Sequence, residues 1–306
     1  MQQSSFEHWK DAIQKYIQDK SISDFEHKVG GGITFNPFAH HENTPDVVGL
    51  IPWPKSTSLG VSLSPASNNK SILKALEFGL QAFKLNVTSE VDLSGLLEGV
   101  NLEYLNTIFY TDNSESNTAL SEYLKNKYPN TKLNDISCNH ELLGSWGDSK
   151  MLVSAIKKDD PTDSLVEICN KIRSLGETPF TIEVNIGQKF FLEIARLRAL
   201  RLLVANLSEN KNFEIHTHIS LSELDSDHSD YIKKTAALLS AYLGGSNVVF
   251  LGLLEDHLDN NTRLEMNIQH ILQLESKLNN YQDPMGGSFF MEDLTRKVCE
   301  NVWQKL

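Results

Sequence analysis

Residues 190–203 read FFLEIARLRALRLL, and the rest of the chain is organised around this stretch. It contains no Gly and no Pro, and nearly all of its residues are strong helix formers. Apolar side chains occupy almost the whole circumference of the helix that the stretch would form. We therefore expect a helix that is buried on most of its surface.

Three arginines, Arg196, Arg198 and Arg201, interrupt this apolar helix. Long arginine side chains can lay their stems on apolar surface and carry the charge to water or to an acidic partner. Glu193 lies one turn before Arg196, where the two side chains can pair. Two interpretations stay open: a core helix whose arginines reach the solvent, or a helix held between a barrel and another subunit.

The same stretch resembles the F-x-E-I-A-[KR]-[FL]-R-A-x-R-L motif of the methylmalonyl-CoA mutase family. Three further segments are similar to motifs of that family and follow in the same order. They are residues 237–249 (ALLSAYLGGSNVV), 267–278 (NIQHILQLESKL) and 283–295 (DPMGGSFFMEDLT). On these four segments the chain is identified as a member of the family, which implies a (β/α)8 barrel fold.

Hydrophobic periodicity points independently to an α/β protein of this kind. Strands are predicted at residues 59–64, 83–87, 107–110, 132–138, 180–186, 213–220 and 248–253. Helices are predicted at residues 69–80, 117–127, 164–175, 190–203, 229–243 and 262–278. This alternation favours a parallel sheet closed into a TIM-type barrel. Residues 139–163 are too short and polar for a further βα unit, so an abbreviated barrel stays possible.

We expect residues 1–55 to form an N-terminal arm for subunit docking and residues 56–306 to form the barrel. An amphipathic helix is predicted over residues 5–18, followed by Gly30-Gly31-Gly32 as a flexible linker. The arm is similar to the family's N-terminal segment, which wraps around the partner subunit. Because a short helix on an extended arm has little core of its own, it needs a surface to dock on.

Composition excludes several classes of partner. The net charge of −12 is opposite to what a nucleic acid or an anionic membrane would attract. The three cysteines, Cys138, Cys169 and Cys299, lie far apart and have no metal-ligand spacing, which is typical of reduced thiols. The N-terminus has no apolar core or arginine-rich pattern of a targeting peptide, and no apolar run is long enough to span a bilayer. We therefore expect a cytoplasmic protein.

The candidate site lies on the strand 213–220, where polar and apolar residues alternate. Glu214, His216, His218 and Ser220 share the face that would point into the barrel lumen. Two histidines on one strand face could supply two ligands of a metal site, but the sequence indicates no third and fourth ligand. We therefore favour structural histidines, keep His216, His218 and Ser220 as candidates for a lumen pocket, and assign no catalytic, cofactor-binding or metal-binding residue.

Other polar clusters have simpler explanations. Residues 225–230 precede a predicted helix and are expected to cap it, and His40-His41 and Asp256-His257 are expected to be solvated. The segment Gly286-Gly287-Ser288 offers backbone N–H groups that could hold an anion, although a structural role is favoured.

The resemblance implies a connection to the adenosylcobalamin-dependent interconversion of methylmalonyl-CoA and succinyl-CoA. Active members carry a cobalamin domain marked D-x-H-x-x-G, and this sequence, which stops at Leu306, contains no such motif. Residues 137–149 do not match the family's S-G-x-H segment. Residues 216–220 replace the family's T-S-G-x-S, and the apolar residues 249–252 replace its H-T-N.

In this chain the scaffold motifs of the family persist, whereas the substrate motifs are altered. In this combination the chain resembles the family's small subunit. The resemblance then implies a non-catalytic chain that binds no cofactor itself and stabilises a large, cobalamin-binding subunit in a heterodimer. Two alternatives stay open. One is a stand-alone barrel enzyme that uses His216 and His218, and the other is a homodimeric scaffold that has lost its partner. Whether the lumen admits coenzyme A esters cannot be read from the residues.

Overall fold

The structure is a computed structural model that describes most of the chain. The described residues are 5–17, 20–30, 32–35, 38–42, 44, 51–129, 133, 136–139, 150–155, 160, 162–208, 212–219 and 229–306.

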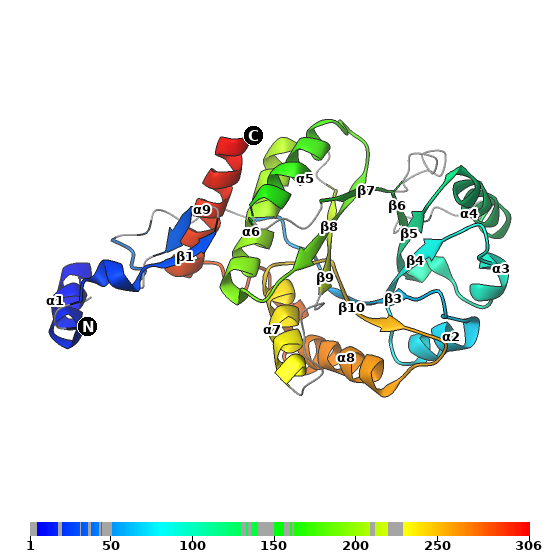
Figure 1. The fold of residues 1–306 in the computed structure, drawn as a ribbon, viewed down its shortest axis with the longest axis horizontal. Helices are drawn as coiled ribbons and strands as arrows, with labels where there is room; N and C mark the ends of the chain where they lie inside the picture. Colours follow the sequence, from blue (N-terminus) through cyan, green and yellow to red (C-terminus); the bar gives the residue numbers. More distant parts are fainter. Residues whose placement is uncertain are drawn as a thin grey trace.

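Eight parallel strands close into a barrel in the order β10-β3-β4-β5-β6-β7-β8-β9, which confirms the predicted (β/α)8 fold (Figure 1). The strands are β3 Ser58–Leu63, β4 Ala82–Val87, β5 Asn106–Thr111, β6 Ile136–Cys138, β7 Lys150–Ser154, β8 Phe180–Ile186, β9 Glu214–Ile219 and β10 Val248–Leu254. Strand β10 pairs with β3, so the ring is complete and the barrel is not abbreviated.

Helices surround this ring. They are α2 Asn69–Glu77, α3 Leu93–Leu96, α4 Ser114–Lys127, α5 Asp163–Arg173, α6 Phe190–Leu207, α7 Ser229–Leu243, α8 Asn260–His270 and α9 Phe289–Lys305. The predicted helix 262–278 is not continuous, because α8 ends at His270 and one π-helical turn follows at Ile271–Glu275. Of the predicted capping segment 225–230, residues 225–228 lie outside the described residues.

Strand β7 lies inside the segment that looked too polar for a βα unit. Its sequence is KMLVS, and Lys150 starts it with a charge that would argue against a buried strand. The side chain of Lys150 is nevertheless only 7% exposed, because its ammonium pairs with Glu214 on β9, two strands away in the barrel. The strand was therefore missed because the partner that allows Lys150 to be buried, Glu214, lies far away in the sequence.

Each strand turns alternate residues toward the helices and toward the lumen. Along β3, Leu59, Val61 and Leu63 join an apolar cluster that packs against α2, α3 and α4. A second, larger cluster joins the outward faces of β8 and β9 to α5, α6, α7 and α9. The opposite positions of the strands are left for the lumen.

Helix α6 lies between the barrel and α9, as Figure 1 shows. Twelve of its residues are buried, which confirms the predicted central helix. The arginines do not reach the solvent: Arg196, Arg198 and Arg201 are 7%, 1% and 2% exposed. The helix is covered by the chain's own last helix, so its burial requires no second subunit.

The arginines instead join α6 to two of the other segments that resemble the mutase family, residues 237–249 and 283–295. Arg198 Nε and Nη2 donate to the two carboxylate oxygens of Asp283 at 3.0 and 2.8 Å, and Nη2 also donates to Glu292 at 2.8 Å. Arg201 Nε donates to the carbonyl oxygen of Gly245 at 2.7 Å, and its Nη1 donates to that of Pro52 at 3.3 Å. Two buried guanidinium groups thus hold the loop before α9, the loop before β10 and the N-terminal region against one helix.

The N-terminal region contains α1 Phe6–Ile17, a 3-10 turn at Ile22–Phe25, and the strands β1 His27–Gly30 and β2 Ile33–Phe35. The triple glycine is not a linker: β1 and β2 pair antiparallel, and Gly32 adopts a φ of 73° in the turn between them. Gly31 lies outside the described residues. Strand β2 packs on α9, where Ile33 is buried and Lys297 Nζ donates to the carbonyl oxygen of Thr34 at 3.0 Å.

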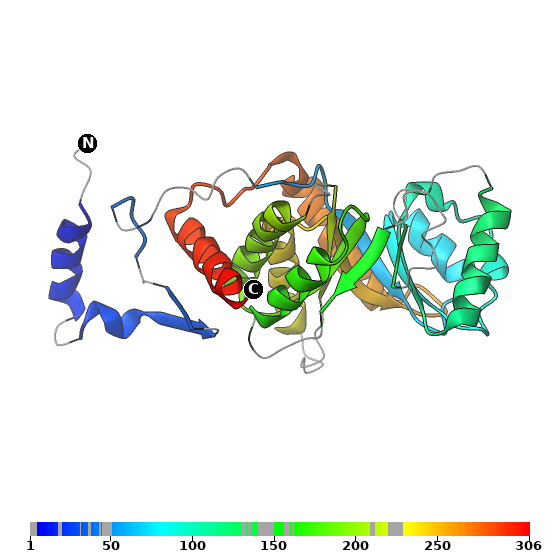
Figure 2. The same ribbon diagram turned by 90° about the horizontal axis from the view of Figure 1, so that it is seen from above.

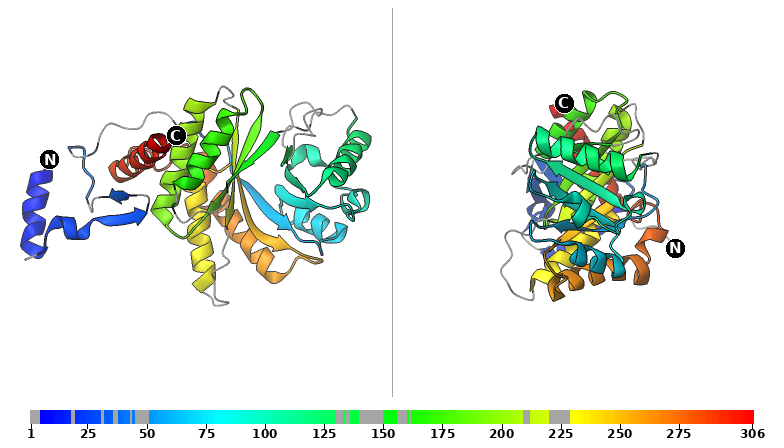
Figure 3. Two further views of the ribbon diagram at one scale, coloured as in Figure 1. Left: turned by 45° about the horizontal axis from the view of Figure 1, so that its top comes forward. Right: turned by 90° about the vertical axis from the view of Figure 1, so that its right-hand side faces the viewer.

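Helix α1 stands away from the barrel, on the side where β1, β2 and α9 lie (Figures 2 and 3). It has no buried residue, and Tyr16 on its surface is 83% exposed. Among the described residues, no helix is both long enough and apolar enough to cross a bilayer.

Candidate functional site in the barrel lumen

Six ionisable side chains converge inside the barrel, and we call them the lumen charge cluster. The cluster comprises Lys84 on β4, Lys150 on β7, Glu183 on β8, and Glu214, His216 and His218 on β9. All six occupy positions that alternate with residues of the outer apolar clusters, so the pleat of each strand directs them inward.

The first half of the cluster crosses the barrel axis. Lys84 Nζ donates to Glu183 Oε1 at 2.8 Å, and His218 Nε2 contacts the same oxygen. Strands β4 and β8 are four places apart in the eight-membered ring, so this ion pair joins opposite walls. Burial favours a higher pKa for Glu183, but the contacts with His218 and Lys84 outweigh it and lower the pKa to about 2. Burial lowers the pKa of His218, which favours the neutral imidazole.

The second half links β7 to β9. Lys150 Nζ donates to Glu214 Oε1 at 2.8 Å, and His216 Nε2 lies 2.9 Å from Glu214 Oε2. Burial again opposes ionisation of Glu214, yet the partners His216 and Lys150 lower its pKa to about 2. Each buried carboxylate is therefore held ionised between a lysine and a histidine.

An aromatic side chain fills the space beside the charges. The ring of Phe250 on β10 stacks on the imidazole of His218, with a centroid distance of 4.6 Å and an interplanar angle of 7°. On the neighbouring strand a Cβ atom added to Gly60 would lie 2.7 Å from Phe250 Cδ1. Ala82, Ile108, Leu152 and Val248 complete an apolar group around Phe250. The lumen is thus occupied by side chains of the chain itself.

Two of the three predicted pocket residues, His216 and His218, lie in this cluster but face different carboxylates. Ser220 lies outside the described residues. Sequence reasoning missed Lys84, Lys150 and Glu183. A signal for them existed, because each is a charged residue within an otherwise largely apolar strand.

The arrangement of the two histidines bears on metal binding. Each imidazole contacts a carboxylate that already accepts from a lysine ammonium at 2.8 Å, and such a cation competes with a metal ion for the same oxygen. Within the described part of the chain, three metal-ligating side chains gather at His40, His41 and Glu42, outside the barrel.

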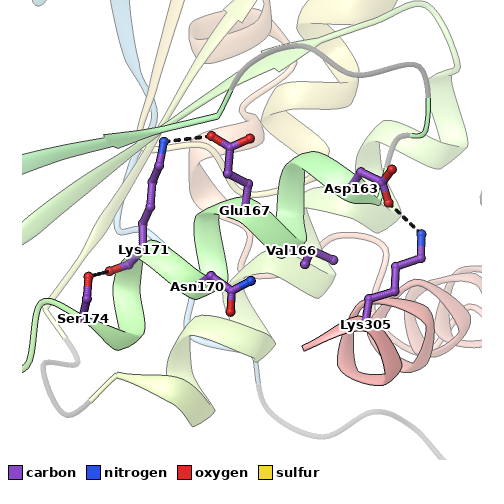
Figure 4. A pocket seen from close by; sticks show the side chains of 7 residues that line it. All are labelled: Asp163, Val166, Glu167, Asn170, Lys171, Ser174 and Lys305. Carbon is purple, nitrogen blue, oxygen red and sulfur yellow. Dashed lines mark hydrogen bonds and ion pairs between the residues drawn. The ribbon is translucent and has the colours of Figure 1, made fainter.

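The described residues include the linings of two surface pockets near the barrel. One, of about 650 Å³, opens at the carboxyl ends of β3 and β4, the end of a barrel where active sites form. Its lining includes Ser64, Asn86, Glu90 and Asp92 and contains no Lys, Arg or His, so it does not suit an anionic ligand. The other, of about 590 Å³, lies outside the barrel between α5 and α9 (Figure 4).

The charges in the second pocket are paired within the chain. Lys171 Nζ donates to Glu167 at 2.9 Å and Lys305 Nζ donates to Asp163 at 2.8 Å, as Figure 4 shows. These pairs hold the side chains at the junction of α5 with the last turn of α9, and they leave no buried charge aimed at a ligand. A structural role accounts for them.

The fold and the cluster together define a (β/α)8 barrel protein whose lumen is filled by an internal charge network. Residues 178–306, which include β8, β9, β10 and α6 to α9, match the family described as methylmalonyl-CoA mutase. This part of the chain is therefore similar in sequence to the methylmalonyl-CoA mutase family.

Several curated relatives agree with this match. Methylmalonyl-CoA mutase of Rhizobium meliloti is 30% identical over 133 residues, and the probable mitochondrial methylmalonyl-CoA mutase of Caenorhabditis elegans is 33% identical over 134. The methylmalonyl-CoA mutase large subunit of Streptomyces virginiae is 30% identical over 135 residues. These alignments cover 39–40% of this chain and 18% of each relative. The chain thus spans less than a fifth of the length of the relatives that it matches.

Proposed function

We propose that this protein is a small-subunit-like component of an adenosylcobalamin-dependent methylmalonyl-CoA mutase. In this proposal it does not catalyse the isomerisation but stabilises a large catalytic subunit. The observation that carries the proposal is the Lys84–Glu183 ion pair, which crosses the lumen between opposite strands at 2.8 Å. Together with Phe250, this pair fills part of the lumen with side chains of the chain itself, which leaves less space there for a coenzyme A thioester.

The altered motifs support the same proposal. His216 and His218, which replace part of the family's T-S-G-x-S, are engaged with Glu214 and Glu183. Phe250, which lies in the replacement of H-T-N, packs against Gly60. The side chains of both replaced segments fill space in the lumen. The arginines of α6, in contrast, contact Asp283 and Gly245 in the segments that retain the scaffold motifs. We therefore assign no cofactor to this chain and place adenosylcobalamin on the large subunit.

The N-terminal region supplies the docking element in this proposal. Helix α1 has no buried residue and stands away from the barrel, while β2 anchors the region to α9 (Figure 2). A short helix with an exposed Tyr16 and little core of its own gains stability when a partner covers it. We expect a cytoplasmic heterodimer.

Co-expression with the cognate full-length mutase chain tests the proposal. Size-exclusion chromatography with mass determination should show a one-to-one complex, and the mutase assay should show that the complex is active and this chain alone is inactive. A truncated variant that lacks residues 1–20 should still fold into the barrel, which circular dichroism can verify. It should no longer form the complex with the large subunit.

Two results would count against the proposal. Turnover by the isolated chain would favour a stand-alone enzyme that uses His216 and His218. A stable homodimer that ignores the large subunit, with the large chain fully active alone, would favour an orphan scaffold.

A further inference from the structure

A series of ring contacts, two stacked and two tilted, connects α1 to α9 along the N-terminal region. Trp9 of α1 stacks on Phe38 with a centroid distance of 4.1 Å, and Phe38 stacks on His40 at 5.9 Å. His40 lies 4.0 Å from the His41 ring, and His41 lies 6.3 Å from Phe289 at the start of α9. The two imidazoles are thus oriented by aromatic neighbours on both sides.

Glu42 brings a carboxylate to the same place. Its Oε2 lies 3.9 Å from His40 Nδ1 and its Oε1 lies 4.0 Å from His41 Nε2. The ligand atoms of all three residues lie within 4.8 Å of one another. A tetrahedral zinc site with bonds of about 2.0–2.1 Å separates its ligand atoms by roughly 3.3 Å. Metal binding would therefore require small side-chain rotations and the opening of the 3.4 Å hydrogen bond that His40 Nδ1 accepts from the N–H of Glu42.

The backbone explains why consecutive residues converge. The N–H of Thr44 donates to the carbonyl oxygen of His40 at 2.9 Å, and this turn brings neighbouring side chains to one side. The N–H of Phe6, the first residue of α1, donates to Glu42 Oε2 at 2.8 Å. A hydrogen bond of this kind holds a metal-ligating carboxylate in place.

We propose that His40, His41 and Glu42 form a binding site for a zinc-class transition-metal ion. Two imidazoles and one carboxylate are a donor set that zinc accepts with three protein ligands, and the remaining position is open to water or to a donor from a partner. Calcium and magnesium prefer oxygen ligands alone, so the imidazoles disfavour them. The bound ion would fasten the segment 38–42 to α1 through Glu42 and hold it beside α9.

Calorimetric titration of the tag-free full-length chain with zinc chloride tests this site. One ion should bind per chain, and His40→Ala, His41→Ala and Glu42→Gln should each weaken binding by more than about 10-fold. His257→Ala is the matched control, because His257 is also an exposed histidine beside a carboxylate, with Asp256 at 2.6 Å, but among the described residues it belongs to no group of three ligand atoms within 4.8 Å of one another. It should bind zinc as the unaltered chain does.

A second readout separates a built site from loss of folding. Zinc should slow tryptic cleavage at Lys10 and Lys28 in the unaltered chain and in His257→Ala, and it should leave cleavage of Glu42→Gln unchanged. The side chains of His41 and Glu42 are 44% and 42% exposed, so His41→Ala and Glu42→Gln should melt at the temperature of the unaltered chain. Absence of zinc binding, or binding that all three substitutions leave intact, would overturn the proposal, and so would calcium binding of equal strength.

Discussion

At the scale of single residues, the lumen is defined by how a glycine and a phenylalanine share space. Gly60 on β3 carries no side chain, and the ring of Phe250 occupies the volume where one would be. Phe250 in turn covers the imidazole of His218, whose partner Glu183 spans the axis to Lys84. The small and the large residue are therefore complementary, and neither can change size alone.

We predict that Gly60→Ala destabilises the protein by about 1–3 kcal/mol, because an added Cβ would approach the Phe250 ring to 2.7 Å. Phe250→Leu should recover part of this loss in the double variant, since it withdraws ring atoms from the contact. Urea unfolding of the four proteins of the cycle measures both effects. If Gly60→Ala unfolds at the same urea concentration as the unaltered chain, Phe250 does not fill the lumen.

At the scale of elements, α6 acts as the junction of the chain. Its guanidinium groups contact the loop before α9, the loop before β10 and the N-terminal region. Gly287 N donates to Glu292 Oε1 at 3.0 Å, so the glycine segment before α9 belongs to this junction. The N–H group of Gly287 therefore has a structural role, which is the role that the sequence favoured for this glycine segment.

We predict that Arg198→Met costs about 3–5 kcal/mol of unfolding free energy, because it removes the guanidinium charge that faces the buried carboxylate of Glu292 and the neighbouring carboxylate of Asp283. Arg198→Lys should recover little of this loss, since an ammonium cannot reproduce the forked contact with Asp283.

The matched control for that change is Arg296→Met. Arg296 also bridges two carboxylates, Asp293 and Glu300, but its side chain is 32% exposed, so its loss should cost less than about 1 kcal/mol. Equal losses for the two arginines in urea titrations would mean that the Arg198 contacts do not hold the junction together.

At the scale of the whole molecule, the buried carboxylates make stability depend on pH. Glu183 and Glu214 have pKa values of about 2 in the folded chain, against an ordinary value of 4.5. Their contribution is therefore complete above pH 4.5 and is lost as the pH falls toward 2. The lowered pKa of His218 acts in the same direction, and its effect begins below the ordinary value of 6.5.

We predict that the free energy of unfolding decreases steadily below pH 6.5. The double variant Lys84→Met with Glu183→Gln removes one carboxylate together with its ammonium and should make this decrease less steep. Urea titrations at a series of pH values between 7 and 3 measure both slopes. An acid dependence that is identical in the two proteins would exclude the Lys84–Glu183 pair as its source.

The sequence sufficed for features that repeat locally. The periodicity of apolar residues predicted the α/β barrel and the buried helix at residues 190–203, because each signal recurs within a few residues. The partners of the charged residues could not be predicted in this way. Lys84 and Glu183 are 99 residues apart, and only closure of the barrel places them on opposite walls. Strand β7 was missed for the same reason, since the partner of Lys150 lies on β9.

The anchoring of β2 on α9 has a consequence for how the chain is made. Lys297 and Thr34, whose contact joins these elements, are 263 residues apart. During synthesis the first residues leave the ribosome long before α9, the helix that covers β2. Ile33 therefore lacks its apolar neighbours on α9 until this last helix emerges. Contacts of such long sequence separation form slowly and leave unprotected surface in the meantime. The early-made end of the chain is therefore the part that stays longest without its native contacts during synthesis.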